Sequence, residues 1–559
     1  MNATKTLSRL VPALAILIMV GGCGGDAPDA SAPQDEEFGE PTDGGTAVVL
    51  IGADMTIPLS MLAQGTIDGN LGGDVMFMEL LRGAWEDGRL VFKTAEESPM
   101  AIARSYEYVG PDSASLRFHM RPDVTWSDGE PLTADDIVFS YSILGDPALA
   151  SPMQSYVELI DSVEAENDST VVFHYSRRHP EMLTHAALPP IPEHIFGDTP
   201  PGEIINHPTL RNPADGNLVV SGPFMIDNWE RGQSITLIPN PEFEPQPYLD
   251  QLVFRVVPDL NTRLVELQTG NADFLQGITF DQVPRIRSQA PHVRLEREEK
   301  RFYDYVAYNP EQFEPFANPE VRRALGLAVD VPAMIAALQM DEFAVPAGGP
   351  FAPIFEGLYD PDAQAPLPYD PDQARSILES HGWADTNNDG VLDRDGQPFQ
   401  FTLITNSGNQ RRADVSQILE QQWSRLGVDV ELRIVEFNTM NDNLATGNFE
   451  AALGGWSVGL SPDLTMTPIW SPDSPFNFTG YEDPDVVRLM DQARQQPTYE
   501  AASPFWRDAA SAIVEDQPYT WLYYMDSVDG VNNRLRGPRI DTYGPYQNTW
   551  EWWIPENLR

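Results

Sequence analysis

Five consecutive residues have the spacing of a hydrolase nucleophile. The segment Gly455-Trp456-Ser457-Val458-Gly459 fits the pattern Gly-x-Ser-x-Gly and follows an apolar, strand-like run over 451–453. In α/β-hydrolases this pattern places the serine between a strand and a helix, with the catalytic acid and then the histidine later in the chain. All eight histidines precede Ser457, and Pro462 disfavours a helix directly after the motif. A hydrolase that uses Ser457 is therefore the least favoured hypothesis.

A second group of residues has the spacing of a calcium-binding loop. Residues 385–396 supply oxygen ligands at positions 1, 3 and 5 and a glycine at position 6, as a calcium loop does. Position 12, which is usually a bidentate glutamate, is Gly396. Two interpretations stay open: an acidic β-turn before a strand over 399–404, or a structural calcium ion held by Asp385, Asn387, Asp389, Val391 and Asp393.

Other metal and nucleotide chemistry is not indicated. The sequence has no Cys/His set with zinc spacing, no His-Glu-x-x-His, no Walker loop and no Gly-x-Gly-x-x-Gly turn. The histidines are scattered along the chain, which argues against a histidine-based nickel site. We expect no cofactor apart from the calcium ion considered above.

The only cysteine, Cys23, follows a short secretory signal. Lys5 and Arg9 precede an apolar run that extends from Leu10 to Val20. This run is shorter than the roughly 20 residues that a membrane-spanning helix needs. The segment Val20-Gly21-Gly22-Cys23 resembles the bacterial lipobox, which implies cleavage before Cys23 and acylation of its sulfur. We expect a signal peptide over 1–22 and a periplasmic or cell-envelope protein that is anchored to the membrane by lipid at Cys23.

Composition bounds the class of protein. The net charge of -49, from 84 acidic and 35 basic residues, effectively excludes nucleic acid as a partner, because phosphate binding needs a basic surface. The excess of acid is spread along the chain, which favours solubility or a saline habitat over attraction of cationic ligands. Residues 23–44 have the composition of a flexible tether. The remaining length, roughly 515 residues, exceeds the limit of a single core and predicts two or three domains.

Several elements can be predicted locally. A buried strand is expected over 46–51, and a helix is expected to begin within 75–81. Residues 116–146 are typical of a strand, a proline-led turn, a second short strand that ends at Ser127-Asp128-Gly129, and a helix. Thr133 is suited to cap that helix, and Asp136 lies where a capping box places its acid.

The same stretch closely resembles the signature of the family 5 solute-binding proteins, the extracytoplasmic receptors of peptide and nickel ABC importers. The resemblance continues in order over about 500 residues. Its further motifs are Ile191-Pro192-Glu193-His194-Ile195-Phe196; Ser221-Gly222-Pro223-Phe224 with Trp229, Gly232 and Asn240; Arg263, Gly270 and Asp273; Asn309 and residues 318–330; and Tyr369-Asp370-Pro371 with Ala374, Leu378 and Gly382.

The resemblance implies an α/β fold, a two-lobed periplasmic-binding-protein clamshell with an extra inserted domain, three domains in total. Lobe 1 would be discontinuous, comprising residues 45–84, 217–306 and 524–559. The inserted domain would comprise residues 85–216, and lobe 2 residues 307–523. Ligand would bind between the lobes, which would close by hinge bending.

The resemblance also implies which residues contact ligand. Trp456 would pack on it from a strand of the cleft, with Ser457 and Gly459 beside it. In family members that bind peptides, an aspartate three residues after this tryptophan pairs with the free amino terminus of the ligand; Gly459 replaces it here, unless Asp463 or another acid substitutes. The other expected cleft residues are Tyr305, Asn477, Tyr481, Tyr523 and Tyr524.

We therefore expect a receptor that binds an oligopeptide or a similar organic solute and delivers it to an ABC permease with its ATPase. We expect it to be a monomer without enzymatic activity. An oligosaccharide receptor on the same fold is the alternative, because aromatic side chains also suit sugar rings. A surface lipoprotein that keeps the fold without a transport role is a further hypothesis.

Overall fold

Eleven strands form the largest sheet of the computed structural model, which describes residues 39–63 and 65–559. Residues 41–559 form one compact unit. The predicted signal peptide and Cys23 lie outside the described residues. Within the described ranges, no helix combines the length and the apolar character needed to cross a membrane.

The order of the strands in the large sheet joins segments that are far apart in the chain. Neighbours in the sheet are β17 (Asp429–Val435), β16 (Gln400–Asn406), β18 (Ala451–Ser457), β12 (Val293–Tyr308), β19 (Tyr519–Asn532), β11 (Phe274–Leu275), β1 (Thr46–Ile51), β10 (Gln251–Val256), β9 (Ser234–Pro239) and β8 (Phe224–Glu230), while β13 (Ala344–Pro346) pairs with β19. The strand predicted over 46–51 is confirmed by β1.

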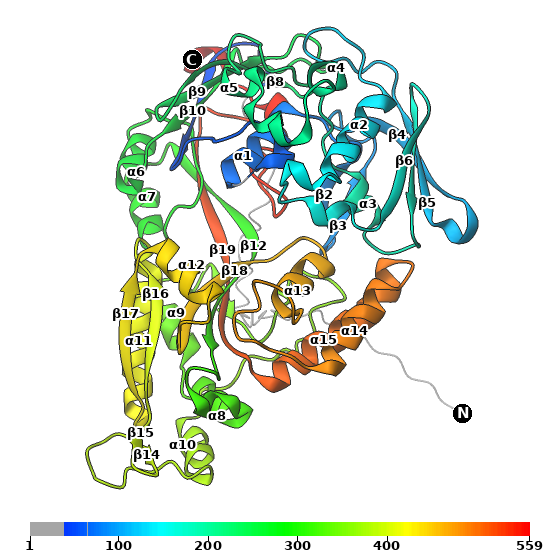
Figure 1. Ribbon diagram of the computed structural model, residues 1–559. Helices are drawn as coiled ribbons and strands as arrows, with labels where there is room; N and C mark the ends of the chain where they lie inside the picture. The colour runs from blue at the N-terminus through cyan, green and yellow to red at the C-terminus, as the bar shows by residue number, and fades with distance from the viewer. Residues whose placement is uncertain (1–38, 64) are drawn as a thin grey trace, which may run out of the picture. The chain divides into compact units, whose positions relative to one another are not determined.

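Two long antiparallel strands, β12 and β19, connect the half of the sheet that holds β1 with the half that holds β16 and β18 (Figure 1). Their N- and C-terminal parts belong to different hydrophobic cores: Val293 and Val528 pack with lobe 1 residues, whereas Tyr303 and Tyr524 pack within lobe 2. The chain therefore passes between the two cores inside these strands. The exact domain boundaries stay predictions.

Helices cover both faces of the lobe 2 part of this sheet. Neighbouring residues of a strand point to opposite faces, so Val306 packs under the helices between residues 319 and 426, whereas Tyr305 packs under those between residues 437 and 516. Tyr523 and Trp521 of β19 also belong to these two different cores, because an irregularity in the pairing with β12 falls between them. The helices of the structure are α1 (Thr66–Asn70), α2 (Ala134–Leu144), α3 (Met182–Ala186), α4 (Glu193–Phe196), α5 (Pro208–Arg211), α6 (Leu260–Gln268), α7 (Val283–Gln289), α8 (Pro319–Leu327), α9 (Val331–Ala337), α10 (Pro371–Ser380), α11 (Gln410–Leu426), α12 (Phe437–Ala445), α13 (Pro462–Trp470), α14 (Pro484–Arg494) and α15 (Tyr499–Asp516).

The inserted domain has its own four-stranded sheet, which shares one continuous hydrophobic core with lobe 1. Helix α2 begins at Ala134 and the predicted capping box of Thr133 and Asp136 is confirmed. The second short strand predicted before Gly129 is wrong, because only a single bridge, between Thr125 and Pro131, forms there. The sheet order is β4 (Ala103–Val109), β5 (Ser115–Met120), β7 (Thr170–Tyr175) and β6 (Ile160–Asn167), and a hairpin of β2 (Arg82–Glu86) and β3 (Arg89–Lys93) precedes it.

Asp136 explains why two separate motifs of the sequence belong together. Its buried carboxylate accepts hydrogen bonds from the backbone N–H of Thr133 (2.8 Å) and of Glu193 (2.9 Å), and from the indole Nε1 of Trp126 (3.3 Å). Asp128 also lies 2.9 Å from His194. The signature stretch and the Pro-Glu-His segment therefore form one joint, with a structural role inside the inserted domain.

The helix expected to begin within 75–81 is wrong. A short helical segment ends at Met76, and the following backbone pairs with two distant segments instead. Gly222 donates to the carbonyl of Met76 (2.7 Å), and Ser221 accepts from the N–H of Met78 (2.9 Å). Because a Cβ on Gly222 would lie only 2.6 Å from the carbonyl carbon of Met76, this close approach needs a glycine.

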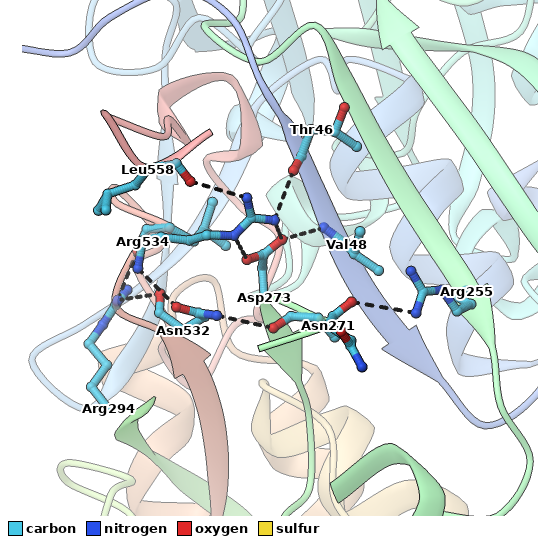
Figure 2. Close-up of polar contacts among 11 residues, drawn as sticks. Thr46, Val48, Arg255, Asn271, Asp273, Arg294, Asn532, Arg534 and Leu558 are labelled. Carbon is cyan, nitrogen blue, oxygen red and sulfur yellow. Dashed lines mark hydrogen bonds and ion pairs between the residues drawn. The ribbon is translucent and has the colours of Figure 1, made fainter. Parts of the chain in front are cut away.

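A buried ion pair ties the separate segments of lobe 1 together (Figure 2). Asp273 is fully buried and lies 2.6 Å from Arg534, which follows β19. Its carboxylate also accepts from the N–H of Val48 (2.8 Å) in β1, and Arg534 donates to the carbonyl of Leu558 (3.4 Å) near the C-terminus. Asp273, which carries part of the family resemblance, is therefore an organising residue of lobe 1.

Candidate functional site

Trp456 lies near the C-terminal end of β18, in a stack of aromatic rings. Its ring is nearly parallel to those of Tyr305 (centroids 6.1 Å apart, 14° between planes) and Phe478 (5.5 Å, 17°). Tyr305 stacks in turn on Tyr519 (4.1 Å), whose hydroxyl accepts a hydrogen bond from Trp456 Nε1 (3.4 Å). Trp456 stays partly exposed and Ser457 is exposed. The end of this strand therefore presents an indole held in place by its neighbours.

The loop after Trp456 is packed closely on helix α13. A Cβ built on Gly459 would lie 2.3 Å from Leu464 Cβ, so the family's aspartate does not fit here with this backbone. Asp463, in the first turn of α13, accepts from Thr467 Oγ1 and lies 3.5 Å from Arg494. Its carboxylate therefore already has two partners inside lobe 2.

The predicted tyrosines are buried in this structure. Tyr305, Tyr523 and Tyr524 are each at most 3% exposed. Tyr523 donates to Asp304 (2.7 Å), and Tyr524 donates to the carbonyl of Gly349 (2.7 Å). Burial raises the pKa of all three hydroxyls. Contact of these three with ligand stays a prediction; here they pack the core beneath Trp456.

Asn477 and Tyr481 stabilise a turn next to the aromatic stack. The side-chain amide of Asn477 donates to the carbonyl of Tyr481 (2.8 Å), and its oxygen accepts from the N–H of Tyr481 (3.0 Å). The Tyr481 hydroxyl donates to Asp516 (2.9 Å). These bonds fix the segment that carries Phe476 and Phe478 against Trp456, so Asn477 and Tyr481 help to position the rings of the site.

Arg301 is a residue of this site that sequence reasoning missed. It lies in β12, where the pairing with β19 shifts register between Glu298 and Phe302. Its Nη1 donates to the carbonyl of Val458, and its own carbonyl accepts from the Val458 N–H (3.2 Å). In sequence Arg301 follows Glu298, Glu299 and Lys300, which reads as a solvated charge run. Only the tertiary pairing shows that it lies beside the Trp456 strand end.

The inserted domain meets lobe 2 on this side of the sheet. Arg89 lies 3.2 Å from Glu500, Arg178 Nε donates to the carbonyl of Pro497 (3.1 Å), and the N–H of Glu356 donates to the carbonyl of Gly88 (3.0 Å). We call this set of contacts between the inserted domain and lobe 2 the seam.

Three titratable groups of the inserted domain are buried near the seam. Burial and the nearby charge of Asp463 raise the pKa of Glu181 to about 7. Burial lowers the pKa of His179 to about 3 and that of His185 to about 4, and the two rings are 5.1 Å apart. The structure thus gathers two histidines that looked scattered. Nevertheless, the described part of the chain holds no group of three or more His, Cys, Asp or Glu residues arranged for a metal ion.

Acidic side chains of the loop over 385–396 accept hydrogen bonds from backbone N–H groups of the same loop. Asp385 accepts from the N–H groups of Asp389 and Gly390 (both 3.1 Å), and Asp389 accepts from Val391 (2.9 Å). Asp393 accepts from the N–H of Thr386 (2.9 Å). These bonds are those of an acidic turn, and the strand predicted to follow it is present as β16. Calcium binding by this loop stays a prediction.

The surroundings of Ser457 do not resemble a hydrolase site. Among the described residues, Ser457 has no hydrogen bond to a histidine or an acid. The expectation that Pro462 disfavours a helix was wrong, because Pro462 is the first residue of α13, with Ser461 as its N-cap. Proline is tolerated at this position, since its missing N–H would have no partner in the helix. The helix nevertheless starts five residues after Ser457, not directly after it.

A cavity of about 800 Å³ lies on the other face of the crossing strands. Its lining includes Phe280, Met340, Arg411 and Met525. Arg411 reaches across this face to Asp304, which is fully buried. Trp456 and Arg301 are not among its lining residues, so this cavity is separate from the Trp456 strand end.

Comparisons with known proteins agree with this architecture. The chain is 28% identical over 562 residues to the oligopeptide-binding protein AppA of Bacillus subtilis (strain 168), covering 99% of this chain and 100% of that protein. The solved structure of AppA from Bacillus subtilis with a nonapeptide superposes with a TM-score of 0.75 at 26% identity, covering 92% and 100% of the two chains. NikZ from Campylobacter jejuni, in complex with Ni(L-His), has the same fold (TM-score 0.75, 22% identity, 91% and 99% covered).

Residues 99–478 match the family described as bacterial extracellular solute-binding proteins, family 5 Middle. This range holds the inserted domain's signature, the crossing strand β12 and the Trp456 strand end. Members of this family are binding proteins. The chain belongs to family 5 of the bacterial extracellular solute-binding proteins.

Proposed function

We propose that this protein is the substrate-binding receptor of an ABC importer and that it captures oligopeptides. The observation that carries the proposal is full-length similarity to an oligopeptide-binding protein, together with a partly exposed indole at the matching strand end. An aromatic ring in a wet cleft offers a large apolar surface and one polar handle. Such a surface suits peptides of varied sequence, because it does not depend on one particular side chain of the ligand.

Capture would use the seam and the two crossing strands. Strands β12 and β19 are the connections on which a hinge could bend. The contacts Arg89–Glu500, Arg178–Pro497 and Glu356–Gly88 join opposite sides of the seam and would separate on opening. A ligand held between the sides would favour the closed form, which the permease would then recognise.

Membrane attachment through Cys23 is part of the proposal. The signal over 1–22 and the lipobox-like Val20-Gly21-Gly22-Cys23 support an N-terminal lipid. The change Cys23→Ser is expected to release the protein from the membrane fraction and to leave the mature N-terminus without an acyl mass. Retention of Cys23→Ser protein in the membrane would contradict this anchor.

Calorimetric titration with a mixed set of nonapeptides tests the peptide proposal. Wild-type protein should bind, and Trp456→Ala should weaken binding by about tenfold or more, since stacked aromatic contacts and lost burial each contribute about 1 kcal/mol or more. Tyr369→Ala, which removes an exposed ring elsewhere in lobe 2, is the matched control and should bind like wild type. Absence of binding by the wild-type protein would overturn the proposal.

A further inference from the structure

Arg301 makes no ion pair with another described residue, although the protein is strongly acidic and the Glu298 carboxylate lies nearby. The chain has 84 acidic residues for 35 basic ones. Within the described ranges Arg301 makes no ion pair; its one side-chain bond goes to the carbonyl of Val458. Its Nε is buried and has no hydrogen-bond partner in the part of the chain that the structure describes. Burial lowers the pKa of Arg301, although the nearby Glu298 opposes this effect.

The position of Arg301 follows from an irregularity in β12. Glu298 pairs with Ser527 and Phe302 pairs with Met525, so three residues of β12 face a single residue of β19. Bulges of this kind redirect side chains and are common next to functional sites. Here the bulge brings the guanidinium of Arg301 to the carbonyl of Val458, at the point where the chain passes from lobe 1 to lobe 2.

Arg301 shares a face with the predicted ligand contact. Tyr303 of β12 is paired with Trp456 of β18. Arg301, two residues before Tyr303, is bonded to Val458, two residues after Trp456. The bulge interrupts the pairing of β12 with β19, but the bond between Val458 and Arg301 continues the regular pairing of β12 with β18. The two-residue alternation along this edge therefore places Arg301 on the face of Tyr303 and Trp456. On the opposite face, Arg411 and Arg412 already pair with Asp304. Among the described side chains, Arg301 is thus a cation that this strand end offers on the side of Trp456.

The chemistry of this group is specific. A guanidinium presents five N–H donors in a planar fork that matches a carboxylate. The bond to Val458 uses one of these donors and holds the group in place, while the residue stays partly exposed. A charge-assisted bond to a carboxylate of the ligand would use donors that the bond to Val458 leaves.

We propose that Arg301 binds a carboxylate of the captured ligand and so makes the receptor selective for ligands that carry one beside the ring bound at Trp456. The inference rests on the proposed peptide-binding function and deepens it. The carboxylate is either the C-terminal group of a peptide or an acidic side chain. In both cases Arg301 acts as a specificity-determining residue.

The test uses the full chain and calorimetric titration with three kinds of nonapeptide. The first has a free C-terminal carboxylate, the second is the same peptide as its C-terminal amide, and the third is the amide with a single glutamate moved through each position. Wild-type protein should bind the first, or one member of the third set, at least about tenfold more tightly than the plain amide. Which of them binds tightly identifies the source of the carboxylate.

Variants separate a ligand contact from a structural role. Arg301→Gln should reduce the preference to within about twofold while still binding the plain amide, and Arg301→Lys should keep part of it because the charge remains. Arg488→Gln removes an exposed guanidinium from α14 and should keep the whole preference. If Arg301→Gln does not fold, Arg301→Lys decides: a full wild-type preference there, with no gain from the planar fork, would overturn the role given to the guanidinium.

The outcomes distinguish this inference from the function on which it rests. Equal binding of acid, amide and every glutamate peptide by wild-type protein would overturn the carboxylate role but leave peptide binding intact. A preference that survives in Arg301→Gln would overturn it as well. No binding of any peptide would overturn both this inference and the proposed function.

Discussion

Gly459 and Leu464 are in direct contact: a Cβ built on Gly459 would lie 2.3 Å from Leu464 Cβ. This packing is the structural counterpart of the sequence departure at the position where peptide-binding family members are expected to carry an aspartate. The loop after Trp456 folds onto α13, so residue 459 serves packing. Residue 459 therefore offers no acid to the amino terminus of a ligand, whereas the cation Arg301, for which we propose a role, suits only a carboxylate.

Replacing Gly459 by alanine should destabilise the protein. The added methyl has no room unless α13 shifts, and overpacking of this kind costs about 1–3 kcal/mol. Gly69→Ala is the matched control, because a Cβ there meets nothing within 4 Å and the residue is helical. Denaturant unfolding should show a lower free energy of unfolding for Gly459→Ala than for the wild-type protein. For Gly69→Ala this free energy should be unchanged or slightly higher. Equal values for the two variants would refute the packing role of residue 459.

Asp136→Asn should weaken the inserted domain. The carboxylate of Asp136 accepts three hydrogen bonds, whereas an amide would turn N–H donors toward at least one of these donors. We expect a loss of about 2–3 kcal/mol in the free energy of unfolding, since buried groups would lose their partners. The neighbouring Asp135 is exposed, so Asp135→Asn should change this free energy by less than about 0.5 kcal/mol. A loss in Asp135→Asn as large as in Asp136→Asn would contradict the joint.

Asp273→Asn should destabilise lobe 1 more than any surface ion pair can. Removing one partner of a buried pair costs about 3–5 kcal/mol, because Arg534 would be left without its counter-charge. Asp485→Asn breaks the exposed pair with Arg488 and should cost at most about 1 kcal/mol. Thermal unfolding monitored by circular dichroism gives both values, and a similar melting temperature for the two variants would count against the role of Asp273.

Glu181 should make stability depend on pH. Its pKa rises from an ordinary value of 4.5 to about 7 in the folded protein, so the unfolded chain releases this proton at lower pH. The folded state is therefore penalised progressively as pH rises from about 4.5 to 7, by up to about 3 kcal/mol, and the penalty is constant above that range.

The variant Glu181→Gln isolates this effect, because glutamine does not titrate. The free energy of unfolding of Glu181→Gln should therefore increase relative to that of the wild-type protein as the pH rises from 5 to 7.5. Glu500→Gln, at an exposed position of the seam, should give a curve parallel to that of wild type. A Glu181→Gln curve that also runs parallel to wild type would show that Glu181 does not titrate in this range.

Local rules predicted the elements whose determinants are close in sequence. Strand β1 and helix α2 with its capping box were found because their patterns and caps lie within a few residues. The helix expected within 75–81 failed because Gly222 and Ser221, about 145 residues away, bind that backbone. The helix propensity of residues 75–81 cannot show that a distant segment will bind their backbone groups instead.

The candidate site was predictable only in part, and for a similar reason. The pattern around Trp456 pointed to the right strand end, but exposure of Tyr523 and Tyr524 depends on helices packed over the sheet. Arg301 was missed because its importance comes from a bulge and from pairing with Val458. A charged residue within a long strand, at the junction of two lobes, is the weak signal that could have drawn attention to it.

Native mass spectrometry of the full protein, purified without denaturant and then unfolded to release bound molecules, shows directly whether the receptor captures peptides. We expect a ladder of peptide masses that disappears in Trp456→Ala and remains in Tyr369→Ala. A single non-peptide mass such as a sugar, or protein that is empty and binds no added nonapeptide, would contradict it.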